Sequence, residues 1–389
     1  MSHADAYSLI AYGNMVEDDT RFAPWHEALR RHVHAGTTVL DLGTGPGIMA
    51  FLASQLGARK VYAIEPDSSI EVAKLCAAGI PGAERIEWIR GLSTEVELPE
   101  PVDLVVGDLH GNLPFYTGNI AAMADARRRL LRPGGILLPS HDTLYAVPAS
   151  APWEVASIDA PWRSNALQLD LTPALPWLLN GFWRARGEPT DAEHLLADVK
   201  RWGCVDYRAE VENRGLDATL DWTFERAGQV DGMYVWFDGE VDAGLGFSNS
   251  PLLPELVYGR TFFPLEHTVA VQIGDTMRTR LGVHRLHDNW VFRWDTCING
   301  ADGQALAAFR QSTARLLPGG VDALRKSEVG HMPTLDEAGQ IQLEILRRMD
   351  GSKTLAEIAR ILLDRFPNKF RNNFDRALAA VASCARQYS

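Results

Sequence analysis

One segment near the N-terminus constrains the fold more than any other part of the chain. The apolar run Thr38–Leu42 predicts a buried strand, and it leads directly into the glycine-rich turn Gly43–Gly47. Ile48–Leu56 then predicts a helix that ends at Gly57. Glycines in such a turn let the backbone approach a bound ligand closely, because they carry no side chain. This order of strand, turn and helix indicates the start of a βαβ nucleotide-binding unit.

Short apolar runs and helix-like segments continue to alternate until about Ala149. Strands that alternate with helices of about 10–15 residues predict βαβ units and a parallel sheet. The further predicted strands are Lys60–Glu65, Arg85–Ile89, Val102–Val106 and Ile136–Leu138, and the further predicted helices are Ser69–Ala78 and Ala121–Leu131.

The pattern changes between about Pro152 and Pro318, where apolar residues recur at every second position. Such alternation predicts an antiparallel sheet or barrel. Ala192–Trp202 predicts a helix inside this region, and the Pro- and Trp-rich stretch Ala151–Trp183 is compatible with an arm or a lid. The predicted strands are Ala218–Phe224, Gly232–Val241, Thr268–Gln272 and Asn289–Trp294.

The last part of the chain follows a linker at Leu316–Gly320 and has helical apolar spacing. Thr354 and Glu357 fit a capping box, in which each residue satisfies a backbone N–H of the other. The predicted helices are Leu335–Arg348, Thr354–Phe366 and Phe374–Tyr388.

Composition excludes several classes of protein. With 38 Lys and Arg against 50 Asp and Glu, the net charge of −12 argues against binding to nucleic acid or anionic membranes. No apolar run approaches the roughly 18 residues of a membrane span, and the N-terminal residues lack a signal-peptide pattern, so we expect a cytoplasmic protein. The cysteines and histidines show no spacing typical of disulfide frameworks or metal sites, so we expect no metal.

Two acidic residues beside the turn indicate which ligand it binds. Glu65 ends the second predicted strand, where a carboxylate accepts hydrogen bonds from both hydroxyls of a ribose. Gly43, Gly45 and Gly47 lack the spacing that a dinucleotide pyrophosphate favours. Asp41 places an anion near the turn, which suits a cationic ligand. The sequence therefore predicts S-adenosyl-L-methionine, a sulfonium nucleoside, as the cofactor.

The quoted segments resemble a known family. DLGTGPG looks like motif I of the class I S-adenosylmethionine-dependent methyltransferases, and Val39–Pro139 resembles the catalytic domain of the protein arginine methyltransferases. Upstream, MVEDDTR resembles the N-terminal helix of that family, and downstream YVWFDGE and TFFPLE resemble its barrel strands, so the resemblance covers about residues 7–298. It implies an α/β fold with a Rossmann-like class I methyltransferase domain, then an antiparallel β-barrel domain, and a homodimer.

The resemblance also implies a set of cofactor-binding residues. Glu65 takes the ribose, Arg21 pairs with the cofactor carboxylate, and Ser93 and Thr94 lie beside the adenine, although the family commonly has an acidic residue where Thr94 stands. The complete set expected to bind the cofactor is Met15, Arg21, Asp41, Gly43, Thr44, Gly45, Glu65, Pro66, Ser93, Thr94 and Asp108.

Two departures from the family bear on the methyl acceptor. The family carries two glutamates on one loop, where this chain has Asp108 and Thr117, and its Thr-His-Trp loop has no His-Trp counterpart near Glu255–Gly259. A guanidinium, with a pKa above about 12, needs a paired anionic clamp. We therefore expect transfer to a nitrogen or carbon nucleophile of a natural-product intermediate, an amino acid or a precursor peptide. Methylation of protein or free arginine, and a binding protein without turnover, are the alternatives.

An acceptor that is not a guanidinium needs at most one base. Asp108 and His110, on the loop after a predicted strand, are the candidate catalytic residues. Aromatic side chains could form the wall of the acceptor pocket, together with Trp25. The residues expected to bind the substrate are Tyr7, Tyr12, Tyr116 and Thr117.

The C-terminal segment shows a second resemblance. Its helix-DGxxT-helix pattern resembles the PqqD-like winged-helix domains, which bind the leader peptide of a modified precursor. A helical cap or a dimerisation module without a ligand is the alternative. The expected domains are therefore a Rossmann-like domain at 1–150, a β-barrel substrate and dimerisation domain at 151–320, and a small C-terminal winged-helix-like α domain at 321–389.

Overall fold

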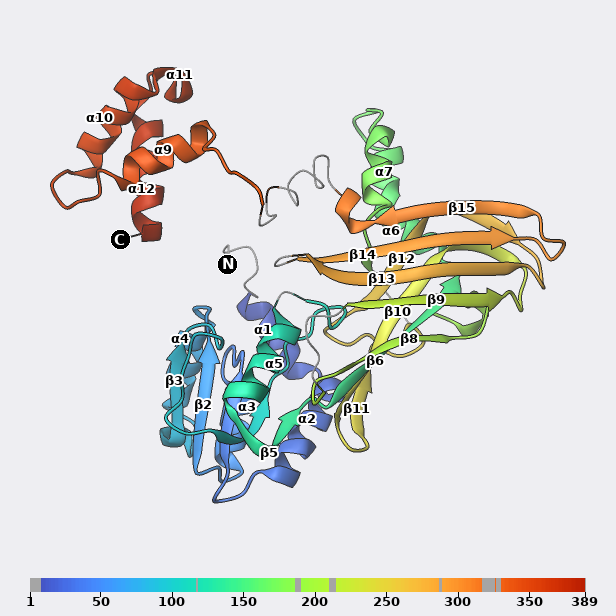
Figure 1. The fold of residues 1–389 in the computed structure, drawn as a ribbon, viewed down its shortest axis with the longest axis horizontal. Helices are drawn as coiled ribbons and strands as arrows, with labels where there is room; N and C mark the ends of the chain where they lie inside the picture. Colours follow the sequence, from blue (N-terminus) through green and yellow to red (C-terminus); the bar gives the residue numbers. More distant parts are fainter. Residues whose placement is uncertain are drawn as a thin grey trace. The chain divides into compact units, whose positions relative to one another are not determined.

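The computed structural model of the chain describes residues 8–116, 118–185, 190–209, 215–286, 289–316, 326 and 330–388. The chain divides into two compact units, Met1–Leu324 and Arg325–Ser389 (Figure 1). Each unit has a hydrophobic core of its own, so the two are described separately.

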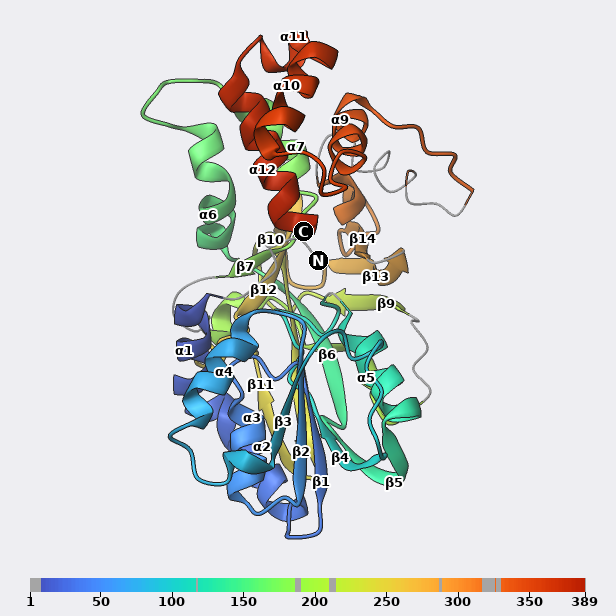
Figure 2. The same ribbon diagram turned by 90° about the vertical axis from the view of Figure 1, so that its left-hand side faces the viewer.

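A five-stranded parallel sheet organises the first part of the larger unit, as the alternating pattern predicts. Its strand order is β3-β2-β1-β4-β5, so the order reverses at β1 and β4, where open α/β sheets bind their ligands. Figure 2 shows α3 and α4 on one face of this sheet and α5 on the other. The strands are β1 (Thr38–Leu42), β2 (Lys60–Glu65), β3 (Ile86–Arg90), β4 (Val102–Val106) and β5 (Leu131–Leu138), and the helices are α1 (Leu9–Glu17), α2 (Asp19–His32), α3 (Ile48–Gln55), α4 (Ser69–Ala77), η1 (Ala83–Arg85) and α5 (Asn119–Arg129).

Two antiparallel sheets form the second part of the larger unit. One has the order β7-β12-β10-β6-β8 with β11 added on β10, and the other has the order β15-β14-β13-β9. Closure of these sheets into a barrel stays a prediction. The strands are β6 (His141–Ala149), β7 (Trp183–Ala185), β8 (Lys200–Asp206), β9 (Leu216–Thr223), β10 (Gly228–Asp242), β11 (Leu245–Ser248), β12 (Arg260–Val271), β13 (Thr276–Leu286), β14 (Asn289–Asn299) and β15 (Ala305–Ser312), and η4 (Thr313–Arg315) follows them.

The prediction of a helix over Ala192–Trp202 is wrong. A single turn, η3 (Ala192–His194), precedes β8, which pairs with β6. The indole of Trp202 is buried and donates a hydrogen bond of 3.0 Å to the Leu281 carbonyl on β13, so sheet pairing and packing override the local helical pattern. The unassigned stretch before it forms α6 (Pro152–Arg163), η2 (Thr172–Ala174) and α7 (Leu175–Leu178).

The smaller unit is helical in its described residues, where the structure shows no strand, so a winged-helix assignment stays a prediction. Ile341, Ile358, Leu362 and Val381 lie in its core. The capping box is confirmed: the Thr354 N–H donates to the Glu357 carboxylate over 2.7 Å and the Glu357 N–H to the Thr354 hydroxyl over 3.3 Å. The helices are α9 (Glu337–Leu346), α10 (Leu355–Arg365), α11 (Pro367–Phe370) and α12 (Phe374–Tyr388).

Among all the described residues of both units, no helix combines the length and the apolar character that a membrane crossing would require.

Candidate functional site

A cavity of about 1320 Å³ lies at the carboxyl ends of β1, β2 and β4, and α1, α2 and the loop 255–258 also line it. It brings together nearly all of the site residues predicted from the sequence. Tyr7 and Thr117 lie outside the described residues. The predicted residues that line the cavity are Tyr12, Met15, Arg21, Asp41, Gly43, Thr44, Gly45, Glu65, Pro66, Ser93, Thr94, Asp108, His110 and Tyr116.

The glycine turn has the geometry of a cradle for a ligand. Gly43 and Gly45 have φ values of +71° and +52°, in the left-handed region that glycine adopts without strain. A Cβ on Gly43 would lie 2.3 Å from the Leu109 side chain, and one on Gly45 would lie 2.9 Å from the Tyr12 ring. Both positions therefore require glycine, and the turn leaves its backbone accessible to the cavity.

Asp41 fixes the conformation of this turn through two hydrogen bonds. Its Oδ2 accepts hydrogen bonds from the Thr44 hydroxyl at 2.5 Å and from the Ala50 N–H of α3 at 2.8 Å. Burial raises the pKa of Asp41 to about 7, although these two hydrogen bonds oppose the shift. The side chain thus joins the turn to the first turn of α3, a structural role that the sequence did not reveal.

Glu65 stands at the end of β2 and lines the cavity. Oε2 accepts from the Gly45 N–H at 2.9 Å, and Oε1 accepts from the Asp67 N–H at 2.9 Å. Burial raises the pKa of Glu65, and the two backbone hydrogen bonds lower it in part. Because a carboxylate oxygen has two lone pairs, each oxygen can still accept one hydroxyl, as binding to a ribose requires.

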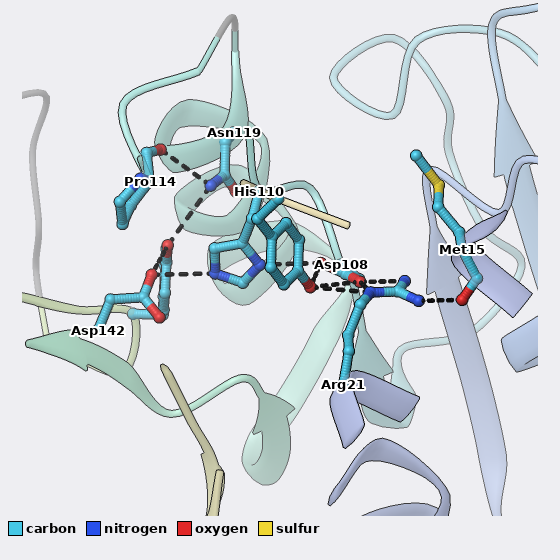
Figure 3. A network of polar contacts seen from close by, with 9 residues as sticks. Met15, Arg21, Asp108, His110, Pro114, Asn119 and Asp142 are labelled. Carbon is cyan, nitrogen blue, oxygen red and sulfur yellow. Dashed lines mark hydrogen bonds and ion pairs between the residues drawn. The ribbon is translucent and has the colours of Figure 1, made fainter. Parts of the chain in front are cut away.

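Arg21 and Asp108 form a buried ion pair in the cavity wall (Figure 3). The Arg21 Nε donates to Asp108 Oδ2 over 2.9 Å, its Nη2 reaches the same oxygen, and its Nη1 donates to the Met15 carbonyl over 2.7 Å. The Tyr258 hydroxyl lies 2.7 Å and 2.8 Å from the two Asp108 oxygens. Among the described residues these contacts use three of the five guanidinium N–H groups, which leaves two for a ligand carboxylate.

His110 extends this pair into a longer buried network. Its Nδ1 lies 2.9 Å from Asp108 Oδ1 and its Nε2 lies 3.0 Å from Asp142 Oδ2. Burial disfavours the charged ring, but Asp142 and Asp108 outweigh it and raise the pKa of His110 to about 10. Burial also opposes ionisation of Asp108, yet Arg21 and His110 hold the pKa of Asp108 well below its ordinary value. The carboxylate of Asp108 is therefore ionised at neutral pH.

The aromatic residues predicted for an acceptor pocket divide into two groups. Tyr12 and Tyr116 line the cavity, and the Tyr12 hydroxyl lies 3.4 Å from the Ser69 hydroxyl. Trp25 does not line it: the side chain is fully buried, with its ring centroid 6.4 Å from that of His110. The prediction of a pocket role for Trp25 is wrong, because α2 turns this residue into the core.

Sequence reasoning missed three residues of the network, namely Tyr258, Asp142 and Tyr207. Asp142 was recognisable in principle, since it stands on the buried face of β6, in phase with Leu144 and Ala146, where an acid needs a partner. Tyr207 carries no comparable signal, because its contact with Asp142 exists only in the folded chain.

In the part of the chain that the structure describes, one group of side chains of the kinds that can bind a metal lies outside the cavity. Asp191, Glu193 and His194 meet at η3, but the two acids are exposed and the His194 ring packs against Trp153 with centroids 4.8 Å apart. This arrangement fits a solvated turn.

Comparison with known proteins adds family information to this geometry. A family model described as ribosomal protein L11 methyltransferase (PrmA) matches residues 25–140. The chain is 30% identical over 239 residues to a probable histone-arginine methyltransferase CARM1 of Oryza sativa subsp. indica, covering 59% of this chain and 45% of the relative. It is 28% identical over 295 residues to an arginine N(omega)-methyltransferase of Streptomyces achromogenes subsp. streptozoticus, covering 72% of this chain and 79% of the relative.

Solved structures share the fold. The crystal structure of Arabidopsis thaliana protein arginine methyltransferase 10 has a TM-score of 0.68 at 21% identity, and covers 78% of this chain and 97% of that one. A Trypanosoma brucei PRMT1 enzyme-prozyme complex with AdoHcy has a TM-score of 0.67 at 17% identity, and covers 77% and 96%. At these low identities, the similarity to the two structures shows that the fold is shared and shows nothing more.

The comparisons also bear on the predicted acceptor. The chain spans about half the length of the first plant relatives, which are named as arginine methyltransferases. The chain is therefore similar in sequence to arginine methyltransferases, and the residues of the cavity fit S-adenosylmethionine as a cofactor.

Proposed function

We propose that this protein transfers the methyl group of S-adenosylmethionine to a guanidino nitrogen of arginine or of an arginine derivative. The observation that supports the proposal most directly is the buried, ionised carboxylate of Asp108 in the wall of the same cavity as the glycine turn. When bound, S-adenosylmethionine supplies a methyl group on a positively charged sulfur.

The residues of the turn fit this cofactor. Glu65 offers two carboxylate oxygens to the ribose, and Arg21 offers two N–H groups to the amino-acid carboxylate. Gly43 and Gly45 line the cavity, and the Leu109 and Tyr12 side chains lie too close to them for a Cβ to fit without a shift. Ser93 and Thr94 line the same cavity beyond Glu65, where the adenine would lie.

Asp108 is the group that holds the acceptor, and it supplies one anion of the clamp, since Thr117 at the place of the family's second glutamate carries no charge. A guanidinium stays protonated at neutral pH, so it binds beside an anion. As the new nitrogen–carbon bond forms, the carbon–sulfur bond of the methyl donor would break, S-adenosylhomocysteine would leave, and the nitrogen would release one proton to water. Both Asp108 oxygens already accept hydrogen bonds from Arg21, Tyr258 and His110. An acceptor guanidinium therefore takes the place of the Tyr258 hydroxyl or shares an oxygen with it.

A labelled-methyl assay tests this function. Purified protein receives S-adenosylmethionine labelled on the methyl group, together with free L-arginine, an arginine-rich peptide, and a mixture of the other amino acids. We expect labelled methylarginine from one of the first two acceptors, identified by mass spectrometry. Label in an aromatic or other non-arginine acceptor alone would support the broader reading, and would end the proposal for arginine.

We further propose a homodimer, which the apolar surface between β6 and β7 supports. Trp153, Leu167, Leu169 and Trp177 are exposed by 41%, 76%, 53% and 39% on α6, α7 and the segment between them. Exposed apolar groups concentrated in one segment commonly mark an interaction surface. Analytical ultracentrifugation should show a dimer that the double substitution Leu167→Glu and Leu169→Glu converts to a monomer. A monomer before substitution would contradict this.

A leader-peptide role for the unit Arg325–Ser389 is a separate proposal. Its own core and its capped α10 support a module that folds as a unit. If a short open reading frame lies beside the gene, a synthetic peptide of that sequence should shift NMR signals of residues 330–388 in the full chain. A peptide that shifts none of these signals would leave the unit as a helical cap.

A further inference from the structure

His110 lies between two carboxylates, and this geometry determines its protonation. Nδ1 faces an Asp108 oxygen at 2.9 Å and Nε2 faces an Asp142 oxygen at 3.0 Å. An ionised carboxylate only accepts hydrogen bonds, whereas a neutral imidazole donates from one nitrogen and presents a lone pair at the other. Both carboxylates therefore receive a hydrogen bond at the same time only when the ring is an imidazolium, which donates from both nitrogens. His110 is then a poor base, because it has no lone pair with which to take a proton.

Asp142 completes an alternating row of four buried groups. Arg21, Asp108, His110 and Asp142 follow one another as cation, anion, cation and anion, so their formal charges cancel (Figure 3). The side chains of His110 and Asp142 are 1% and 0% exposed. In such surroundings an uncompensated charge is costly, so each member of the row depends on its neighbours.

The far end of the row is fixed by the antiparallel sheet. Asp142 belongs to β6, and its Oδ2 also accepts from the Tyr207 hydroxyl at 2.6 Å. Tyr207 in turn lies 3.4 Å from the Asn119 side-chain nitrogen at the start of α5. Opposite Asp142 in the register of β6 and β10 stands Gly239, where a Cβ would approach Asp142 Oδ1 to 3.2 Å. Oδ2 is therefore held by His110 and Tyr207, whereas the buried Oδ1 has no hydrogen-bond partner among the described residues.

Apolar and aromatic groups close the remaining sides of His110. The Phe237 ring stacks on the imidazole with centroids 5.2 Å apart, and Phe247 and Tyr258 meet it edge-on at 5.9 Å and 5.6 Å. The charged and titratable groups that face the imidazole are Asp108, Asp142, Tyr207 and Tyr258. Burial raises the pKa of both tyrosine hydroxyls, so they stay neutral donors.

We propose that Asp142 is a positioning residue for methyl transfer, which acts through the imidazolium of His110 to hold the Asp108 carboxylate oriented and ionised at the cavity. This rests on the proposed function. Asp142 itself does not line the cavity. Its effect on the acceptor therefore passes through His110, and it depends on the ring keeping both protons.

The substitution Asp142→Asn separates this role from a purely structural one. It keeps the size of the side chain and an oxygen that accepts from Tyr207, but it removes the charge that favours the imidazolium. The pKa of His110 should fall, so the ring becomes neutral at a lower pH than in the original chain. Activity that needs the imidazolium then declines as the pH rises, and partly returns as the pH is lowered.

The experiment uses the full chain labelled with 15N-histidine, and His110→Gln assigns the signal. We expect the His110 ring to carry both protons at pH 8 in the original chain and to be neutral there in Asp142→Asn. With the acceptor found in the methyl assay, kcat at pH 8 should fall about 10- to 100-fold in the variant, partly recover at pH 6, and leave KM within about threefold. Asp206→Asn, which makes the same change on the exposed end of β8, should alter neither quantity.

A neutral His110 ring at pH 8 in the original chain would overturn the proposal, as would an Asp142→Asn variant with the original ring titration and pH profile. If Asp142→Asn does not fold, the titration of the original chain alone decides whether His110 carries both protons at pH 8, as the proposal requires. If no acceptor is methylated by the original chain, the proposed function fails, while the ring titration still decides whether Asp142 controls the ionisation of His110.

Discussion

At the residue scale, three buried acids in one cavity have pKa values shifted in different directions because their partners differ. Asp41 meets a hydroxyl and a backbone N–H, and burial raises its pKa to about 7. Glu65 meets two backbone N–H groups, and its pKa is also raised by burial. Asp108 meets a guanidinium and an imidazole, so it stays ionised despite full burial. The sequence marks all three as acids at strand ends, but their charge states depend on partners that the fold brings from elsewhere.

Glu65→Ala should weaken binding of S-adenosylhomocysteine. The substitution removes the carboxylate that we expect to bind the ribose. Each hydrogen bond to a charged group contributes about 1.5–3 kcal/mol to binding. Isothermal titration calorimetry should show a Kd about 10- to 100-fold higher. Glu84→Ala, at a glutamate that is 74% exposed, is the matched control and should bind like the original chain. Equal affinities in the two variants would contradict the assignment of Glu65.

Asp41→Asn should change stability in a pH-dependent way. In the folded chain Asp41 keeps its proton up to about pH 7, whereas in the unfolded chain it loses it near pH 4. The folded state therefore binds more protons between these values, and its free energy of unfolding falls as the pH rises through that window. Asparagine removes this cost, which is on the order of 4 kcal/mol at most.

Urea unfolding at pH 4 and pH 8 measures the effect. The variant should gain stability relative to the original chain at pH 8 and lose this advantage at pH 4. A variant that is less stable than the original chain at pH 8, but not at pH 4, would show that folding lowers the pKa of Asp41 instead of raising it.

At the element scale, α1 lines part of the cavity while it stays largely exposed. None of its residues is buried, and Leu9, Ile10 and Val16 are exposed. Its Tyr12 nevertheless lies against the glycine turn, since a Cβ on Gly45 would meet the ring at 2.9 Å. A helix with few buried contacts opens readily, and a ligand beneath it adds the missing contacts.

Binding of S-adenosylhomocysteine should therefore slow hydrogen exchange in α1. We expect amides of residues 9–17 to exchange about tenfold more slowly with ligand, and those of α10 in the other unit to exchange at the same rate. Ligand binding that is proved by calorimetry but leaves exchange in α1 unchanged would show that this helix does not contribute to the site.

The same scale shows why some elements were predictable. β1, the turn and α3 follow from local signals: a buried apolar run, glycines at positive φ and an apolar helix. The strand β8 could not be predicted in this way, because its pairing with β6 and the burial of Trp202 depend on residues far away in the sequence. For the same reason the sequence placed Asp108 and His110 in the site but not Asp142, whose partner comes from another sheet.

At the scale of the whole molecule, the chain consists of two units with separate cores. Every residue that lines the cavity belongs to the unit Met1–Leu324. The part of the chain with the parallel sheet supplies the turn and Asp108, the loop before β12 supplies Tyr258, and β6 supplies Asp142. The site is therefore assembled within one unit.

Removal of residues 325–389 should leave the cavity intact. A chain that ends at Leu324 should bind S-adenosylhomocysteine with a Kd within about threefold of the full chain, since the lining residues and their partners all remain. Calorimetric titration of both proteins makes the comparison. Loss of binding in a shortened chain that still unfolds cooperatively would mean that the second unit shapes the site.

The cavity at the ends of β1, β2 and β4 should bind S-adenosylmethionine, and isothermal titration of S-adenosylmethionine and of S-adenosylhomocysteine into the full chain measures this binding. We expect one binding site per chain with an affinity in the micromolar range, and no binding of a dinucleotide such as NAD. A chain that circular dichroism shows to be folded, but that releases or takes up no heat with either compound at about 1 mM, would contradict it.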